Sequence, residues 1–176
     1  MVKRLPVFLA VFIGQVVFDQ WTKMLATEHL KNTPTKSWLG DVFRLTYATN
    51  EGAFLSLGAG LPPQARYWVL TIGVGLLLLS LCVYALFSEQ IWKTKLDQWE
   101  VGAYALIASG GFSNWVDRAR FGGSVVDFMN MGIGGLRTGV FNIADLAILA
   151  GIGVLFVHGY RKEKAEKAAK AAASPQ

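Results

Sequence analysis

Two aspartates, Asp127 and Asp145, stand in stretches of the sequence that are otherwise mostly apolar. Asp127 lies between two valines and a Phe-Met pair, and Asp145 lies near the start of the last long apolar run, three residues after Asn142. Two carboxyl groups that lie close together tend to share a proton, because both cannot ionise readily. One of them could take a proton from water while the other donates one to a scissile carbonyl. A proton-coupled transporter or channel would use a similar pair.

Two further pairs of polar residues have helical spacing. Asp19 and Lys23 are four residues apart in the first apolar run, so they share a helix face and can pair directly. They could brace the helix or hold a nearby catalytic group in place. Asn114 and Arg118 are also four apart, and they follow two glycines that allow another helix or a substrate to approach closely. Arg118 could equally be an interface anchor.

The histidines and the cysteine do not have the spacing of a metal site or a nucleophilic site. His29 and His158 are far apart in the chain, and Cys82 is the only cysteine. No serine stands beside a plausible histidine base. We therefore predict no metal, no cofactor and no covalent intermediate.

The elements that must position these residues are four apolar runs, which predict a membrane α-helical fold with four transmembrane helices. Of the 176 residues, 53% are hydrophobic and only 16% are charged. Residues 67–87 carry no charge, and about 20 apolar residues suffice to cross a bilayer as a helix. The predicted spans are residues 5–26, 66–88, 99–117 and 140–160.

The net charge of +5 indicates membrane orientation rather than nucleic-acid binding, because the basic residues stand mostly beside the spans. Nine of them fall on the side of both termini: Lys3, Arg4, Lys93, Lys95, Arg161, Lys162, Lys164, Lys167 and Lys170. Seven fall on the other side, so the positive-inside rule places both termini in the cytoplasm by a narrow count. Asp127 and Asp145 accordingly belong at the outer leaflet.

Among the segments between the spans, only the first has a clear strand pattern. Between spans 1 and 2, residues 43–47 alternate as a half-buried strand and residues 53–57 could return, which predicts a small extracytoplasmic β-sheet. The glycine-rich residues 118–139 form a short extracytoplasmic segment between spans 3 and 4. Residues 1–160 read as one membrane domain, and residues 161–176 read as a basic cytoplasmic tail that extends the last helix or frays.

Five short motifs, taken in order, resemble those of the lipoprotein signal peptidase (signal peptidase II) family. They are Asp19–Lys23, Asn50–Phe54, Gly110–Arg118, Val125–Phe128 and Phe141–Asp145, and the resemblance extends to about Tyr160. It implies an aspartyl endopeptidase of the bacterial inner membrane whose catalytic residues are Asp127 and Asp145. The matching substrate-binding or supporting positions are Asp19, Lys23, Asn50, Gly52, Gly111, Asn114, Arg118 and Asn142.

The resemblance also implies the substrate. The family removes the signal peptide from a prolipoprotein that already carries diacylglycerol, and it cuts before the lipidated cysteine. Membrane lipid and a globomycin-type inhibitor are the other expected partners, and a monomer suffices for the site. A small proton-coupled transporter or channel subunit remains the alternative, although both key acids would lie at one leaflet. A non-enzymatic scaffold would explain the spans but none of the acids.

Overall fold

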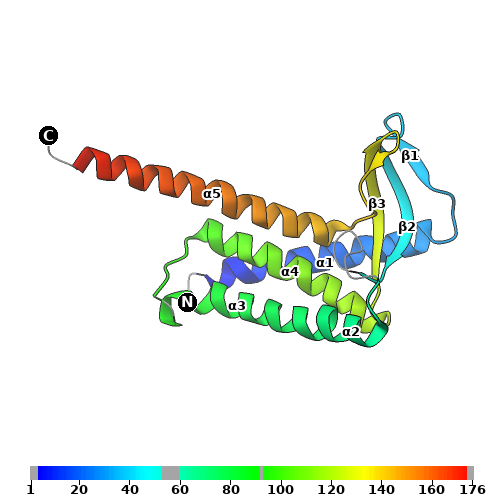
Figure 1. Ribbon diagram of the computed structural model, residues 1–176, viewed down its shortest axis with the longest axis horizontal. Coiled ribbons are helices and arrows are strands. Elements are labelled where there is room, and N and C mark those ends of the chain that lie inside the picture. The colour runs from blue at the N-terminus through cyan, green and yellow to red at the C-terminus, as the bar shows by residue number, and fades with distance from the viewer. Residues whose placement is uncertain (1–3, 53–59, 92, 174–176) are drawn as a thin grey trace.

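Long helices run side by side, and a small β-sheet stands across one end of them (Figure 1). This computed structural model describes residues 4–52, 60–91 and 93–173. The helical elements are α1 (Leu5–Leu30), α2 (Pro63–Tyr67), the π-helix η2 (Trp68–Gly73), α3 (Val74–Ile91), α4 (Gln98–Arg120) and α5 (Ile143–Ala173). The strands are β1 (Lys36–Trp38), β2 (Phe43–Asn50), β3 (Val125–Ile133) and β4 (Leu136–Arg137).

Three helical stretches of the described chain are long and apolar enough to cross a membrane: Leu5–Leu30, Gln64–Ile91 and Ile143–Lys170. They correspond to the first, second and fourth predicted spans. The third predicted span, residues 99–117, forms most of α4, which is long enough to cross but is not among the three. The physical reason is its position, because α4 packs against α1, α3 and α5 and can therefore carry buried polar residues in place of apolar ones.

Small residues allow α4 to lie close to its neighbours. A Cβ atom added to Gly110 would lie 2.5 Å from the carbonyl oxygen of Ala144, and one added to Gly151 would lie 2.7 Å from that of Ala103. Backbone therefore meets backbone along the contact between α4 and α5, as in other membrane helix pairs that pack through small residues. At Gly111, an added Cβ would lie 2.4 Å from the side chain of Leu78, so this glycine makes room for a side chain of α3.

The π-helix η2 supplies a further contact between helices. The wider turn of a π-helix disturbs the regular hydrogen-bond ladder and changes which carbonyls remain available. In η2 the carbonyl oxygen of Thr71 accepts a hydrogen bond of 2.8 Å from the indole nitrogen of Trp115 in α4. Thr71 is buried, so this contact satisfies a polar group inside the bundle and fixes α4 against η2.

The sheet is antiparallel in the order β1-β2-β3-β4, and it differs from the predicted one. The predicted return strand at residues 53–57 lies outside the described residues. Strand β2 pairs with β1 on one side and with β3 on the other, and β3 comes from the segment 118–139 that we expected to be only a short connection. The sequence analysis did not recognise the mostly apolar run Val125–Met131 as the long-range partner of β2. Its apolar side chains cover the end of α1, where Phe128 and Met129 pack with Ala26 and Leu30.

The start of α1 and the end of α5 lie at the end of the bundle opposite the sheet (Figure 1). Helix α5 continues without a break from Ile143 to Ala173, so the basic tail extends the last helix through its described part. The sheet and the helix ends beneath it thus form one pole of the molecule, and the basic segment forms the other.

Candidate functional site

Asp127 and Asp145 both contact Asn142, although they come from different elements. The side-chain amide of Asn142 donates to Asp127 Oδ1 at 2.6 Å, and the backbone N–H of Asn142 donates to Asp145 Oδ2 at 3.1 Å. The Asp145 N–H in turn donates to the Asn142 side-chain oxygen at 3.0 Å. One asparagine therefore orients both carboxyl groups.

The surrounding structure holds this arrangement by two independent means. Asp127 lies on β3 opposite Ala48 of β2, so the sheet register sets its position. Asp145 lies in the first turn of α5, where the positive end of the helix dipole favours a negative charge. The exposed fraction is 2% for Asp127 and 9% for Asp145, so both carboxyls are shielded from bulk water.

The electrostatic setting raises the pKa of Asp127 into the neutral range. Burial, together with the neighbouring Asp145 carboxylate, raises the pKa of Asp127 from 3.8 to about 7. Hydrogen bonds from Asn142 and from the Asn50 side chain, the latter at 3.1 Å, act in the opposite direction because they favour the ionised form. The pair can thus hold one proton at the pH at which most proteins work.

Asn114 links Asp145 to a buried charge cluster. Its amide donates to Asp145 Oδ1 at 3.0 Å, and its side-chain oxygen accepts from Lys23 Nζ at 2.7 Å. Lys23 also forms ion pairs with Asp19 at 2.8 Å and with Asp117 at 2.9 Å. The proposed pairing of Asp19 with Lys23 is present, and it is continuous with the polar contacts of Asp145.

The two acids of this cluster each bind a further element. Asp19 accepts from the backbone N–H of Ala144 at 2.7 Å, next to Asp145, and from Ser113 at 2.7 Å. Asp117 accepts from the N–H of Val126 at 3.2 Å, next to Asp127, and from Gln20 at 2.8 Å. Each acid therefore holds the backbone beside one member of the pair.

Asp117, Ser113 and Gln20 were not among the predicted site residues. A signal for Asp117 was present, since it is an acid at the end of an apolar run, three residues after Asn114. The sequence could not show that Asp117 would contact the strand carrying Asp127, because that contact depends on how α4 meets the sheet. Gln20 and Ser113 lie inside two of the five motifs, but nothing in their own spacing singled them out as site residues.

Arg118 and Gly52 are brought together at the rim of the site. The Arg118 guanidinium donates to the carbonyl oxygen of Gly52 at 2.7 Å and to that of Asn114 at 3.3 Å. The N–H of Gly52 donates to the Asn50 side-chain oxygen at 2.9 Å, which positions the Asn50 amide that binds Asp127. Arg118 thus ties the end of β2 to α4.

A groove of about 450 Å³ leads along the helices to Asp145. Its polar end is formed by Asn114, Arg118 and Asp145, with Gly111 beside them. Its apolar walls are Leu70 and Val74 on one side and Ile148, Leu149 and Ile152 of α5 on the other. An extended or helical apolar peptide lying in the bilayer could reach the carboxyl pair along this groove.

The structure also gathers Asp97, Glu100 and His158, a group that the sequence analysis did not identify. Their ligand atoms lie within 4.8 Å of one another. These groups already have partners: Asp97 caps the start of α4 in a capping box with Glu100, and His158 contacts Asp97 Oδ2 at 2.5 Å. Their proximity is therefore explained by the attachment of α5 to the start of α4.

Comparisons with known proteins agree with this geometry. Residues 11–161 match the family model for signal peptidase (SPase) II. A lipoprotein signal peptidase of Halalkalibacterium halodurans is 32% identical over 93% of this chain and 98% of its own length. The corresponding protein of Nostoc sp. is 34% identical over 88% and 89%. A solved bacterial membrane enzyme shares the fold, with a TM-score of 0.71, 22% identity and coverage of 89% of this chain and 88% of the other.

Proposed function

The chain belongs to the signal peptidase II family, and we propose that Asp127 and Asp145 are the catalytic pair of this membrane protease. Its activity is the removal of signal peptides from prolipoproteins. The observation that carries the assignment is the contact of both buried carboxyls with Asn142. A proton-coupled transporter, the alternative reading of the sequence, is not supported, because the relatives are signal peptidases.

The two carboxyls have different roles in the proposed reaction. Asp145, as a carboxylate at the start of α5, takes a proton from the attacking water. Asp127, whose pKa is raised to about 7, donates its proton to the scissile carbonyl as the tetrahedral intermediate forms. Asn142 keeps both groups in place, and Asn114 holds Asp145 through the hydrogen bond at 3.0 Å.

The pH dependence follows from the proton on Asp127. The turnover rate should fall as the pH rises past about 7, because Asp127 then loses the proton it donates. Asn50→Ala removes a hydrogen bond that favours the ionised form, so the pKa rises and the fall should move to higher pH. The measurement is the turnover rate at saturating substrate across pH 5–9, with Thr49→Ala, an exposed neighbour, as the control. An unchanged profile, or a shift to lower pH, would contradict the assignment of the acid.

We propose that α4 is a fourth span and that the sheet end of the bundle faces the outside. Helix α4 has 23 residues, enough to cross a bilayer, and it is surrounded by the three apolar spans. With four spans, both termini share one side, and the basic residues of α5 beyond Tyr160 favour the cytoplasm for that side. The catalytic pair would then work at the outer leaflet, in a site that one copy of the chain completes. A globomycin-type inhibitor would occupy the groove that ends at Asp145.

The substrate should require its diacylglyceryl group. Each buried acyl CH₂ contributes roughly 0.8 kcal/mol to membrane partitioning, so two chains fix the depth of the modified cysteine beside the groove. The test compares one prolipoprotein with and without prior lipidation, at equal concentration and in the same bilayer. We expect kcat/KM to be lower by about 10²-fold or more without the lipid, because the effective concentration is lost. Equal cleavage of the two forms would show that the lipid takes no part in recognition.

A further inference from the structure

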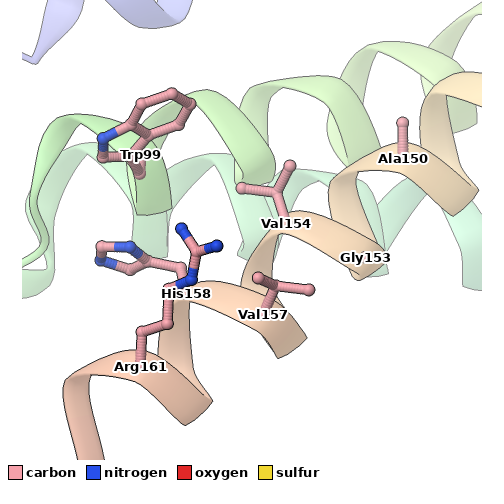
Figure 2. A pocket seen from close by; sticks show the side chains of 7 residues that line it. All are labelled: Trp99, Ala150, Gly153, Val154, Val157, His158 and Arg161. Atoms are coloured by element: carbon pink, nitrogen blue, oxygen red, sulfur yellow. The ribbon is translucent and has the colours of Figure 1, made fainter.

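A second groove lies along α5, between Ala150 and Arg161 (Figure 2). Its volume is about 480 Å³. Ala150, Gly153, Val154 and Val157 form its apolar floor and wall, Trp99 of α4 closes one side, and His158 lines it beside Arg161. From Ala150 to Arg161 the groove follows about 16 Å of helix at 1.5 Å per residue, close to the length of an acyl chain.

This groove is distinct from the one that leads to Asp145. Asp145, Leu149 and Ile152 follow one another at helical spacing and share a face of α5, whereas Ala150, Val154 and Val157 follow one another on a different face. The two grooves also end at different depths. Arg161 is about 24 Å along the helix from Asp145, so it approaches the opposite interface of a hydrocarbon core about 30 Å thick.

One cation stands at the mouth of the groove without an acidic partner among the described residues. The Arg161 side chain lines the groove, and Figure 2 shows it extending back along α5 toward Trp99. The acids nearby have partners, since Asp97 contacts His158 at 2.5 Å and Glu100 contacts Lys162 at 3.5 Å. The guanidinium can bind a phosphate group, and the apolar groove below it can hold an acyl chain joined to that phosphate. The indole beside them is a side chain typical of the membrane interface.

We propose that this groove binds one anionic phospholipid, with an acyl chain along Gly153 and the phosphate at Arg161. The helix that carries the groove crosses the membrane, so lipid is the molecule that reaches this face at the highest concentration. Basic pockets between transmembrane helices bind anionic headgroups in this way. The bound lipid would fasten the end of α5 to the start of α4.

The headgroup contact is tested on the purified full-length chain by native mass spectrometry from detergent micelles. Phosphatidylglycerol and phosphatidylcholine with identical chains are added at equal concentration, with glycerol 3-phosphate as a separate arm. Phosphatidylglycerol should be retained about fivefold better, as expected for one basic residue at a headgroup. Arg161→Gln should abolish the preference, and Lys164→Gln, which removes one tail charge outside the groove, should keep it. Equal retention of the two lipids, equal effects of the two variants, or equal binding of glycerol 3-phosphate would overturn the proposal.

The apolar contact is tested by filling the groove. A Cβ atom at Gly153 meets no atom within 4 Å, so the side chain of Gly153→Leu starts in open space and should occupy the place of the acyl chain. Gly159→Leu is the matched control, because Gly159 is equally open and does not line the groove. We expect only Gly153→Leu to lose the bound lipid, while both variants keep cleaving prolipoprotein. If Gly153→Leu retained the lipid, or raised KM for the prolipoprotein instead, the groove would belong to the substrate and the proposal would be wrong.

Discussion

Asp127→Asn and Asp145→Asn should each reduce the cleavage rate of lipidated prolipoprotein by about 10²–10⁴-fold, the usual contribution of a positioned acid or base. Asparagine has nearly the shape of aspartate and can keep a hydrogen bond to Asn142, but it cannot transfer the proton. The measurement is the turnover rate of purified variants, with insertion and folding verified by membrane fractionation and thermal unfolding.

Asp41→Asn is the matched control for these two variants. Asp41 lies beside the sheet, where its carboxylate contacts Ser37 and Arg44, and it has no contact with the catalytic pair. Its variant should cleave at close to the normal rate. If either Asp127→Asn or Asp145→Asn cleaved within tenfold of the unmodified protein, the catalytic assignment would have to be abandoned.

Lys23→Met should cause a large loss of stability. The exposed fraction of Lys23 is 3%, and its ammonium group lies 2.8 Å from Asp19 and 2.9 Å from Asp117. Removing one partner of a buried ion pair costs about 3–5 kcal/mol, because the remaining charge has no compensation. In this chain, the substitution leaves two buried carboxylates, those of Asp19 and Asp117, without their cation. For a chain of this length, we expect the unfolding temperature in detergent to fall by about 10 °C or more.

A matched comparison separates the loss of this ion pair from a general effect of the substitution. Lys36→Met changes an exposed lysine of β1, so its unfolding temperature should stay within about 2 °C of the normal value. Combining Lys23→Met with Asp19→Asn and Asp117→Asn removes the uncompensated charges and should recover part of the loss. Equal unfolding temperatures for Lys23→Met and Lys36→Met would contradict a structural role for the buried cluster.

The two aspartates could be identified from the sequence, whereas the strand pairing that positions Asp127 could not. Asp127 and Asp145 stand out because an acid in an apolar stretch is costly and requires an explanation, and the structure does bring both to Asn142. The pairing of β2 with β3 could not be read in the same way, because about 75 residues separate Asn50 from Val125 and strand alternation does not identify a distant partner. The roles of these residues remain predictions until the variants are measured.

The apolar pattern predicted α4 as well as its neighbours, but it could not explain why α4 is less apolar than they are. A helix surrounded by other helices exchanges lipid-facing residues for glycines and for buried polar groups such as Ser113, Asn114 and Asp117. Hydropathy averages the apolar character of the residues within a run, and it contains no information on which elements pack against that run. Contacts such as that of Asp117 with the N–H of Val126 depend on the packing and emerge only from the three-dimensional structure.

The attachment of the two aspartates to different elements has a consequence for how the enzyme is made. Asp145 belongs to α5, which follows the other described helices along the chain, and Asp127 is placed by the pairing of β3 with β2. Neither event alone produces the pair. If the two aspartates are the catalytic pair, as we propose, a nascent chain that has inserted only α1 to α4 contains no functional protease.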